Sequence, residues 1–307
     1  MHKTTPGYGD HWMKLFRHIP LLAMPAMLVI VEIGAILLSL PMQEAGFAAF
    51  EDPSSVANPL IFVAILLVFT AFLLLLIRFK LRRFISFIIA VSIFFTFVYI
   101  FGSISYALTT DPIAGLAGSF VPAVLATLLL YLYPEWYVID TLGLLIAAGA
   151  ASIFGISLEV LPVIILLIIL AVYDAISVYK TKHMIALAEG VVETKSPILF
   201  VVPKRRGYSY RKEGLGPLEE GERGAFIIGM GDMIMPAILV VSANIFSGGM
   251  RIGPLAIPAL GAMAGSVAGL SLLLVYVNRG KPQAGLPPIN GGAILGFLAG
   301  FGLTLLL

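Results

Sequence analysis

The chain has 307 residues, of which 60% are hydrophobic and only 12% are charged. Soluble domains are usually about 45–50% apolar, so this composition excludes a water-soluble globule and indicates a membrane protein with several spans. The net charge of +2 says little about partners, because the placement of charges matters more than their sum in a membrane protein. The chain has no cysteine, which excludes disulfides, thiolate nucleophiles and cysteine-ligated metals.

Apolar runs long enough to cross a bilayer recur along the whole chain and predict an all-α membrane protein with nine transmembrane helices. The predicted spans are residues 21–40, 59–77, 84–106, 113–133, 141–158, 161–178, 225–246, 252–277 and 287–307. The polar connection 179–224 separates an N-terminal six-helix part, 1–178, from a C-terminal three-helix part, 225–307, and we expect a single functional unit. Inside that connection, the apolar stretch 198–202 is too short to span and predicts a strand.

The basic residues indicate how the chain crosses the membrane, because lysine and arginine favour the cytoplasmic side of short loops. With nine spans and a cytoplasmic N-terminus, all 19 basic residues except Arg251 lie inside. This predicts a multi-pass integral membrane protein with its C-terminus outside, in the cell (plasma) membrane if the chain is prokaryotic. The same rule explains the basic run from Lys204 to Lys212, so we expect no nucleic-acid partner. The four histidines lie outside the apolar runs, which argues against a metal site within the membrane.

Three acidic residues lie well inside predicted spans, where each ionisable group costs about 2.5–3.5 kcal/mol. They are Glu32, Asp174 and Asp232. The sixth and seventh spans run in opposite directions from the same loop, which puts Asp174 and Asp232 at roughly 9 and 13 Å below its surface. If the two face each other, both cannot ionise easily, so one can activate water while the other polarises a carbonyl. Glu32 has no identifiable partner and is interpreted as a buried, protonated structural acid or a packing contact.

The residues around Asp232 predict a loosened, open helix. Gly229 falls three residues earlier, on the same face of the expected helix, and Gly231 is adjacent, so another backbone can approach closely. Pro236 has no N–H to donate to the carbonyl of Asp232. These features suit an extended peptide. The residues alone nevertheless leave a proton or cation transporter open, because paired intramembrane acids serve that function equally well.

Two motifs resemble those of a known family. Tyr173-Asp174 in the sixth span and Gly229-Met230-Gly231-Asp232 in the seventh resemble the YD and GxGD motifs of the presenilin and signal peptide peptidase family. The nine-span topology and the long loop between the two aspartates are similar too, and the short termini resemble a microbial homologue. The resemblance implies that Asp174 and Asp232 are the catalytic pair and that Tyr173, Gly229 and Gly231 surround it. Helix packing is the alternative role for Tyr173 and the two glycines.

The third motif of the family, PAL, is present only in altered form. Pro258-Ala259-Leu260 lies in the eighth span, which is the wrong place, and we interpret it as a coincidence. The positional match is Ala284-Gly285-Leu286-Pro287 before the last span. We expect Gly285, Leu286 and Pro287 to bind substrate, with Leu286–Pro288 forming non-helical backbone whose polar groups are free.

The resemblance implies an intramembrane aspartyl endopeptidase that cleaves transmembrane segments or membrane-retained signal peptides, and that needs no metal or organic cofactor. We expect the substrate, once unwound, to add as a strand near Ile198–Val202 or Leu286–Pro288. The expected partners are transmembrane-helix or signal-peptide substrates and the lipid bilayer, and self-association as a homo-oligomer stays open. The alternatives are the transporter, a prepilin peptidase, which the absence of cysteine disfavours, and an inactive scaffold that only binds membrane helices.

Overall fold

A computed structural model describes residues 8–181, 199–204, 207–214, 224–277 and 283–306. Within these ranges the chain is almost entirely helical. The long helices are α1 (Tyr8–Glu44), α2 (Ala57–Arg78), α3 (Arg82–Leu108), α4 (Pro112–Leu132), α5 (Trp136–Ser157), α6 (Val160–Ile176), α9 (Met230–Phe246), α10 (Ile257–Val277) and α11 (Leu286–Leu306). Eight of the helices described are long and apolar enough to cross a membrane, whereas α9 is apolar but has only 17 residues.

Local sequence signals explain where several helices begin and end. The carboxylate of Asp111 accepts the N–H of Ile113 at 3.2 Å and caps α4, whose first residue is a proline. Helix α2 ends in a turn where Lys80 adopts the left-handed region, with φ at 57°. Helix α5 begins at Trp136, five residues before the predicted start of the fifth span, so Asp140 lies on this helix and not in a loop.

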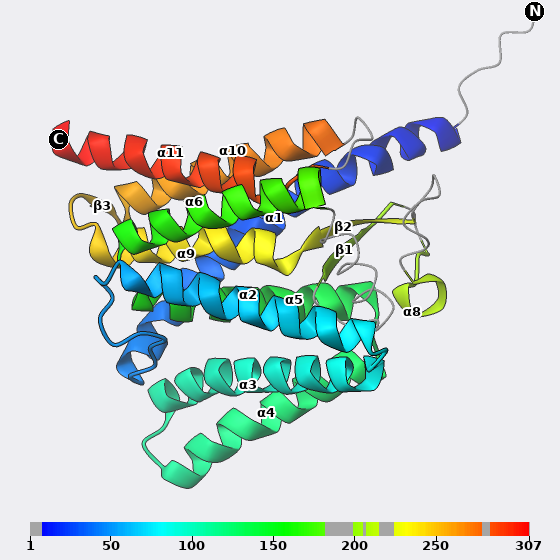
Figure 1. Cartoon of the computed structure of the whole chain (residues 1–307), viewed down its shortest axis with the longest axis horizontal. Helices are drawn as coiled ribbons and strands as arrows, with labels where there is room; N and C mark the ends of the chain where they lie inside the picture. The colour runs from blue at the N-terminus through cyan, green and yellow to red at the C-terminus, as the bar shows by residue number, and fades with distance from the viewer. Residues whose placement is uncertain (1–7, 182–198, 205–206, 215–223, 278–282, 307) are drawn as a thin grey trace, which may run out of the picture.

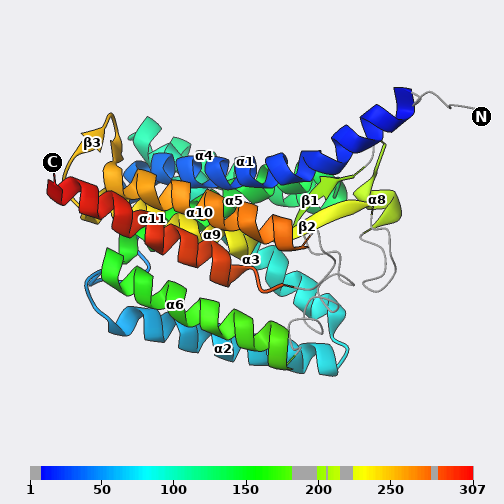
Figure 2. The same cartoon turned by 90° about the horizontal axis from the view of Figure 1, so that it is seen from above.

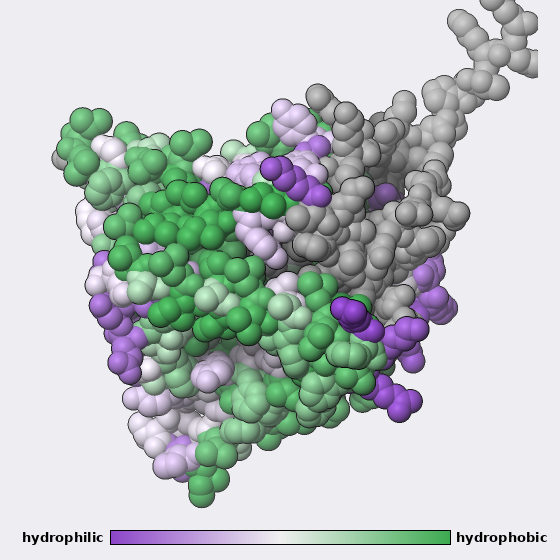
Figure 3. Space-filling view, in the orientation of Figure 1, coloured by the Kyte–Doolittle hydropathy of each residue, from purple (hydrophilic) through white to green (hydrophobic). Residues whose placement is uncertain are grey.

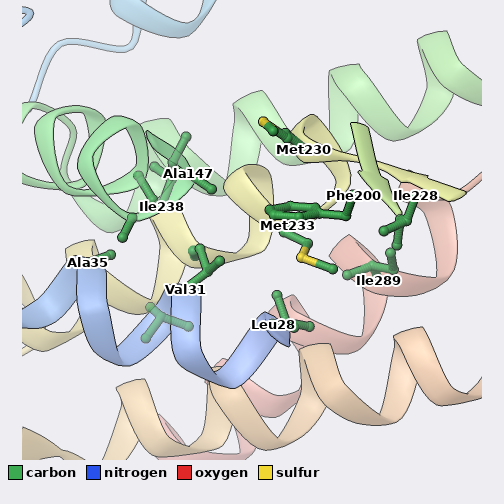
Figure 4. Packing of buried hydrophobic residues seen from close by; sticks show 14 of the residues in the cluster. Leu28, Val31, Ala35, Ala147, Phe200, Ile228, Met230, Met233, Ile238 and Ile289 are labelled. Atoms are coloured by element: carbon green, nitrogen blue, oxygen red, sulfur yellow. The ribbon is translucent and has the colours of Figure 1, made fainter. Parts of the chain in front are cut away.

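Helix α9 lies at the centre of the bundle. It packs against α5, α10, α1, α11 and α6, and its side chains are buried along most of its length. Helix α2 packs outside α6, and the α3–α4 hairpin lies at the periphery, as two perpendicular views show (Figures 1 and 2). Met233 of α9 points toward Leu28 of α1 and Ile289 of α11 (Figure 4). The centre of the core is therefore formed by the helix that carries Asp232.

The tightest helix pair is α10–α11, which meets through glycines spaced four residues apart. A Cβ added at Gly261, Gly265 or Gly269 of α10, or at Gly292 or Gly296 of α11, would lie against backbone of the opposite helix, closer than real Cβ contacts allow. Small residues let two membrane helices approach until their backbones touch. This contact fixes the position of α11 from its first turn, because the backbone of Pro288 lies over Gly269.

Two short antiparallel hairpins interrupt the helices. Strand β1 (Leu199–Pro203) pairs with β2 (Ala225–Gly229), and β3 (Arg251–Ile252) pairs with β4 (Leu255–Ala256). The predicted strand 198–202 is confirmed from Leu199 onward, and residue 198 lies outside the described residues. A continuous seventh span over 225–246 is wrong, because 225–229 is a strand. Three aromatic or β-branched residues in a row favour that strand, and glycines 229 and 231 weaken a helix at this point.

The predicted eighth span is also too long at its start, since residues 252–256 form the β3–β4 turn before α10. Arg251 holds this turn to the end of α9. Its guanidinium donates to the backbone carbonyl and side-chain oxygen of Asn244 and to the carbonyl of Pro254. The one basic residue predicted outside therefore has a structural role.

Candidate active site

Asp174 lies near the end of α6, where the helix widens into the π-helical turn η1 (Ser177–Thr181). Its side chain is buried, with 4% exposed. Its Oδ2 accepts the backbone N–H of Leu286 at 3.0 Å, and the N–H of Gly285 also hydrogen-bonds to this carboxylate. The start of α11 is thus attached directly to the acid of the sixth span.

Asp232 lies in the first turn of α9, three residues after β2 ends. Its carboxylate is partly exposed and hydrogen-bonds to the N–H of Gly229. Gly229 therefore contacts Asp232 from the end of a strand and not from the same helical face, because the helix begins only at Met230. An added Cβ at Gly285 would lie 3.0 Å from Oδ2 and 3.1 Å from Cγ of Asp232.

The two carboxylates meet across the Gly285–Leu286 backbone. Leu286 touches Asp174 and Gly285 touches Asp232, and the two acids interact electrostatically. The structure thus brings together Asp174, Asp232, Gly229, Gly285 and Leu286. Two carboxyl groups that contact neighbouring residues of one segment are the groups that general acid and general base catalysis of hydrolysis require.

The remaining predicted residues surround this pair less closely. A Cβ added at Gly231 meets no atom within 4 Å among the described residues, so the chain has open space beside Asp232. Tyr173, the residue directly before Asp174, is partly exposed. Pro287 lies in the first turn of α11, so the expectation of a non-helical Leu286–Pro288 is wrong. Proline is compatible with the first turn of a helix, where its missing N–H has no partner in any case.

Tyr179 was not predicted from the sequence. Its hydroxyl donates to Oε1 of Gln283 at 2.9 Å and accepts the N–H of Ala284 at 3.5 Å. Together with Asp174, it attaches three consecutive backbone positions, 284–286, to the end of α6. An aromatic residue near the end of a span is common in membrane proteins, so the sequence carried no signal for this pairing.

Glu32 is separate from the aspartate pair. It is fully buried on α1, and its Oε1 lies 2.6 Å from the hydroxyl of Ser266 on α10. The sequence had given Glu32 no partner, because a serine on a distant span is not distinguishable from other serines. Its position between α1 and α10 is that of a packing contact.

Comparisons with known proteins agree with this geometry. The family described as signal-peptide peptidase, presenilin aspartyl protease matches residues 25–304. A structure titled as a presenilin family intramembrane aspartate protease, in space group C222, is 53% identical, with a TM-score of 0.70 over 92% of this chain and 99% of that chain. A second, in space group P2, is also 53% identical, with a TM-score of 0.69 over 93% and 98% of the two chains. No curated protein sequence matches.

These matches extend over nearly the whole chain and give no support to the transporter alternative. They confirm the resemblance that the two aspartate motifs indicated. The chain is an integral membrane protein and belongs to the signal peptide peptidase and presenilin family of intramembrane aspartyl proteases.

Proposed function

We propose that Asp174 and Asp232 are the catalytic pair of this protease, which hydrolyses peptide bonds in transmembrane segments or membrane-retained signal peptides. The observation that carries the proposal is the meeting of both carboxylates at Gly285 and Leu286, although they come from different helices. One carboxylate takes a proton from water, and the other donates a proton to the carbonyl oxygen of the scissile bond. Water adds to the carbonyl carbon and gives a tetrahedral intermediate that is not bonded to the enzyme. This intermediate collapses when the C–N bond breaks: the leaving amine takes the proton that the first carboxylate removed from water, and the second carboxylate takes back the hydroxyl proton.

The substrate has to be extended at the site, because a helix hides its carbonyls in hydrogen bonds. The described contacts make β1 a poor place for an added strand. On its outer edge, the N–H of Val201 donates to Oδ1 of Asp140 at 2.8 Å and Pro203 has no N–H, which leaves only the N–H of Leu199 at the start of the strand. The N–H of Leu286 is already bonded to Asp174. At each of the two sites expected from the sequence, one backbone N–H, that of Val201 or of Leu286, is therefore already bonded to an aspartate.

The outer edge of β2 is the alternative. The N–H of Lys204 donates to the carbonyl of Gly224, so the backbone N–H and C=O groups of the even-numbered residues of β1 point toward β2. The backbone groups of Val201 and of its partner Ile227 point away from the other strand. Among the described residues, the N–H groups of Ala225 and Ile227 have no partner on that side. We propose that the substrate pairs with this edge, which leads along the chain directly to Asp232.

We further propose the orientation that the basic residues predict: a cytoplasmic N-terminus, nine crossings with α9 among them, and an external C-terminus. A hydrophobic band crosses the face seen in Figure 3, with hydrophilic side chains gathered at its two ends. The strands β1 and β2 and the helix α8 (Tyr210–Glu213) lie together at one end (Figure 1), which would be cytoplasmic. The plasma membrane is the proposed location for a prokaryotic chain, and 1–178, 179–224 and 225–307 would act as one unit.

The direct test is cleavage of a tagged single-span peptide by the purified protein, by Asp174→Asn and by Asp232→Asn. We expect both variants to remain folded and to lose cleavage. Cleavage that survives either substitution would refute the assignment of the pair. Ion flux through reconstituted vesicles, lost in the same two variants, would instead favour transport. Cross-linking in the membrane would show whether the protein self-associates.

Strand pairing at β2 can be tested from the side of the substrate, without changing the enzyme. Proline is placed at each position near the cleaved bond in turn, which removes one N–H at a time. Pairing with one edge predicts alternating loss of cleavage, because successive N–H groups of a strand point in opposite directions. A uniform loss at all positions would exclude strand addition at this edge.

A further inference from the structure

Asp140 is a further acidic residue on a membrane-spanning helix, and it does not belong to the proposed catalytic pair. It lies on α5, one turn after the helix begins, and is partly buried. Its Oδ1 accepts the backbone N–H of Val201 at 2.8 Å, across 61 positions of sequence. A partly buried carboxylate on a membrane-spanning helix is costly, so its position beside a single backbone N–H calls for an explanation.

The next turn of α5 holds the same region in place. A Cβ added at Gly143 would lie 2.5 Å from Cε of Met230 and 3.1 Å from the ring of Phe200. Phe200 belongs to β1 and is fully buried, and Met230 is the first residue of α9. Figure 4 shows both side chains where the strands meet α9, close to Met233. Asp140 and Gly143 therefore form one contact site on α5, which touches both β1 and the start of α9.

This contact site is connected to the catalytic pair through one strand pairing and one hydrogen bond. Val201 is paired with Ile227 in β2, and Gly229 at the end of β2 hydrogen-bonds to Asp232. A shift of β1 on α5 would therefore move β2, and with it both the open strand edge and the acid. Asp140 also closes the outer edge of β1, because a carboxylate that accepts one N–H cannot itself continue a ladder of strand hydrogen bonds.

We propose that Asp140 is a positioning residue: through Val201 it sets the register between the β2 edge and Asp232, and so decides which bond of the substrate is cut. This inference rests on the proposed function, since it assumes that the substrate pairs with β2. It predicts that removing Asp140 changes the position of cleavage and not only its rate.

Glu135 provides a matched control. It is buried in the turn before α5 and accepts the hydroxyl of Ser209 at 2.7 Å, so it also attaches the cytoplasmic connection to α5. It does not contact β1 or α9 through any hydrogen bond described. Replacing either acid would loosen the connection between the loop and α5, whereas only the replacement of Asp140 would change the register of the substrate.

The experiment compares Asp140→Ala, Asp140→Glu, Asp140→Asn and Glu135→Ala on one single-span peptide, with product masses and initial rates measured. Asp140→Ala should lower the rate about fivefold, as for the loss of one ordinary hydrogen bond, and should change the ratio of products cut at neighbouring bonds. Asp140→Glu moves the acceptor by one methylene and should also change that ratio, even if Asp140→Ala does not fold. Asp140→Asn keeps an oxygen acceptor and should restore the wild-type products.

Wild-type product ratios in both Asp140→Ala and Asp140→Glu would overturn the proposal, even if the rate fell, because Asp140 would then be structural only. The same change in product ratio for Glu135→Ala would overturn it as well. The catalytic assignment is tested separately, because cleavage retained in Asp174→Asn or Asp232→Asn refutes the pair. If those two variants are inactive but the Asp140 variants give wild-type products, only the present inference is refuted.

Discussion

Gly285 offers a direct test of how closely the aspartate pair is packed. A methyl group added there would meet the whole Asp232 carboxylate, with Oδ2, Cγ and Oδ1 at 3.0, 3.1 and 3.2 Å. Ordinary contacts of a Cβ begin at 3.4 Å, so either the carboxylate or the Gly285 backbone has to move by about 0.4 Å. The backbone of Gly285 is not in the left-handed region, so alanine causes no conformational strain of its own. Crowding is the one effect of Gly285→Ala.

The expected loss follows from the sensitivity of catalysis to position. A misplacement of 1 Å can lower a rate about 100-fold, so a shift of about 0.4 Å should lower kcat roughly sixfold, or about 1.1 kcal/mol of transition-state stabilisation. Initial rates on a single-span peptide measure this, with thermal unfolding as a check on the fold. Gly291→Ala is the matched control: it lies on α11, the helix that follows Gly285 directly, its added Cβ meets nothing within 4 Å among the described residues, and its activity should equal that of the wild type. Wild-type kcat in folded Gly285→Ala would refute the close contact between this backbone and Asp232.

Three further predictions concern the surroundings of the pair. Gly265→Ala should lower the free energy of unfolding by about 1–3 kcal/mol, because its methyl group would meet backbone of α11; an unchanged melting temperature would contradict that packing. Tyr179→Phe should lower kcat about fivefold, since it removes the hydrogen bond to Gln283 and the longer one from Ala284, both in the segment before α11, and equal rates would show that these bonds are dispensable. Arg251→Ala should lower the free energy of unfolding by about 1–3 kcal/mol with kcat retained, because its contacts join α9 to the β3–β4 turn; a loss of kcat at full stability would place its role elsewhere.

The sequence was most informative where a charged residue lies in an apolar predicted span. Asp174 and Asp232 stand out because charge in an apolar span is costly, and the arithmetic of spans placed both at similar depth. Gly285 and Leu286 were predicted because their position before the last span matches that of the PAL motif in the resembled family. What the sequence could not predict were contacts made by ordinary residues. Tyr179 depends on a pairing across the fold that no local pattern encodes.

Asp140 was missed for a different reason. The predicted fifth span began at residue 141, so this acid was assigned to a loop where it needs no explanation. The start of α5 at Trp136 makes it a carboxylate on a membrane helix. The seventh span failed in a similar way, because residues 225–229 are as apolar as a helix and hydropathy does not distinguish a buried strand from the end of a span. In both cases the error was at an element boundary close to the aspartate pair.

In the proposed function, these boundaries are what would let an extended peptide lie beside an acid within the membrane. Backbone that is not helical is tolerated within a bilayer only where protein or a water-filled cavity surrounds it. Two such junctions converge here, the β2–α9 junction before Asp232 and the chain at Gly285 before α11, beside the π-helical turn that follows Asp174. Helix α9, with 17 residues, is about 26 Å long, less than the roughly 30 Å of a hydrocarbon core. In the orientation proposed above, β2 takes the place of the missing turn, and its outer edge would lie at the level of the membrane where α9, the helix of Asp232, begins.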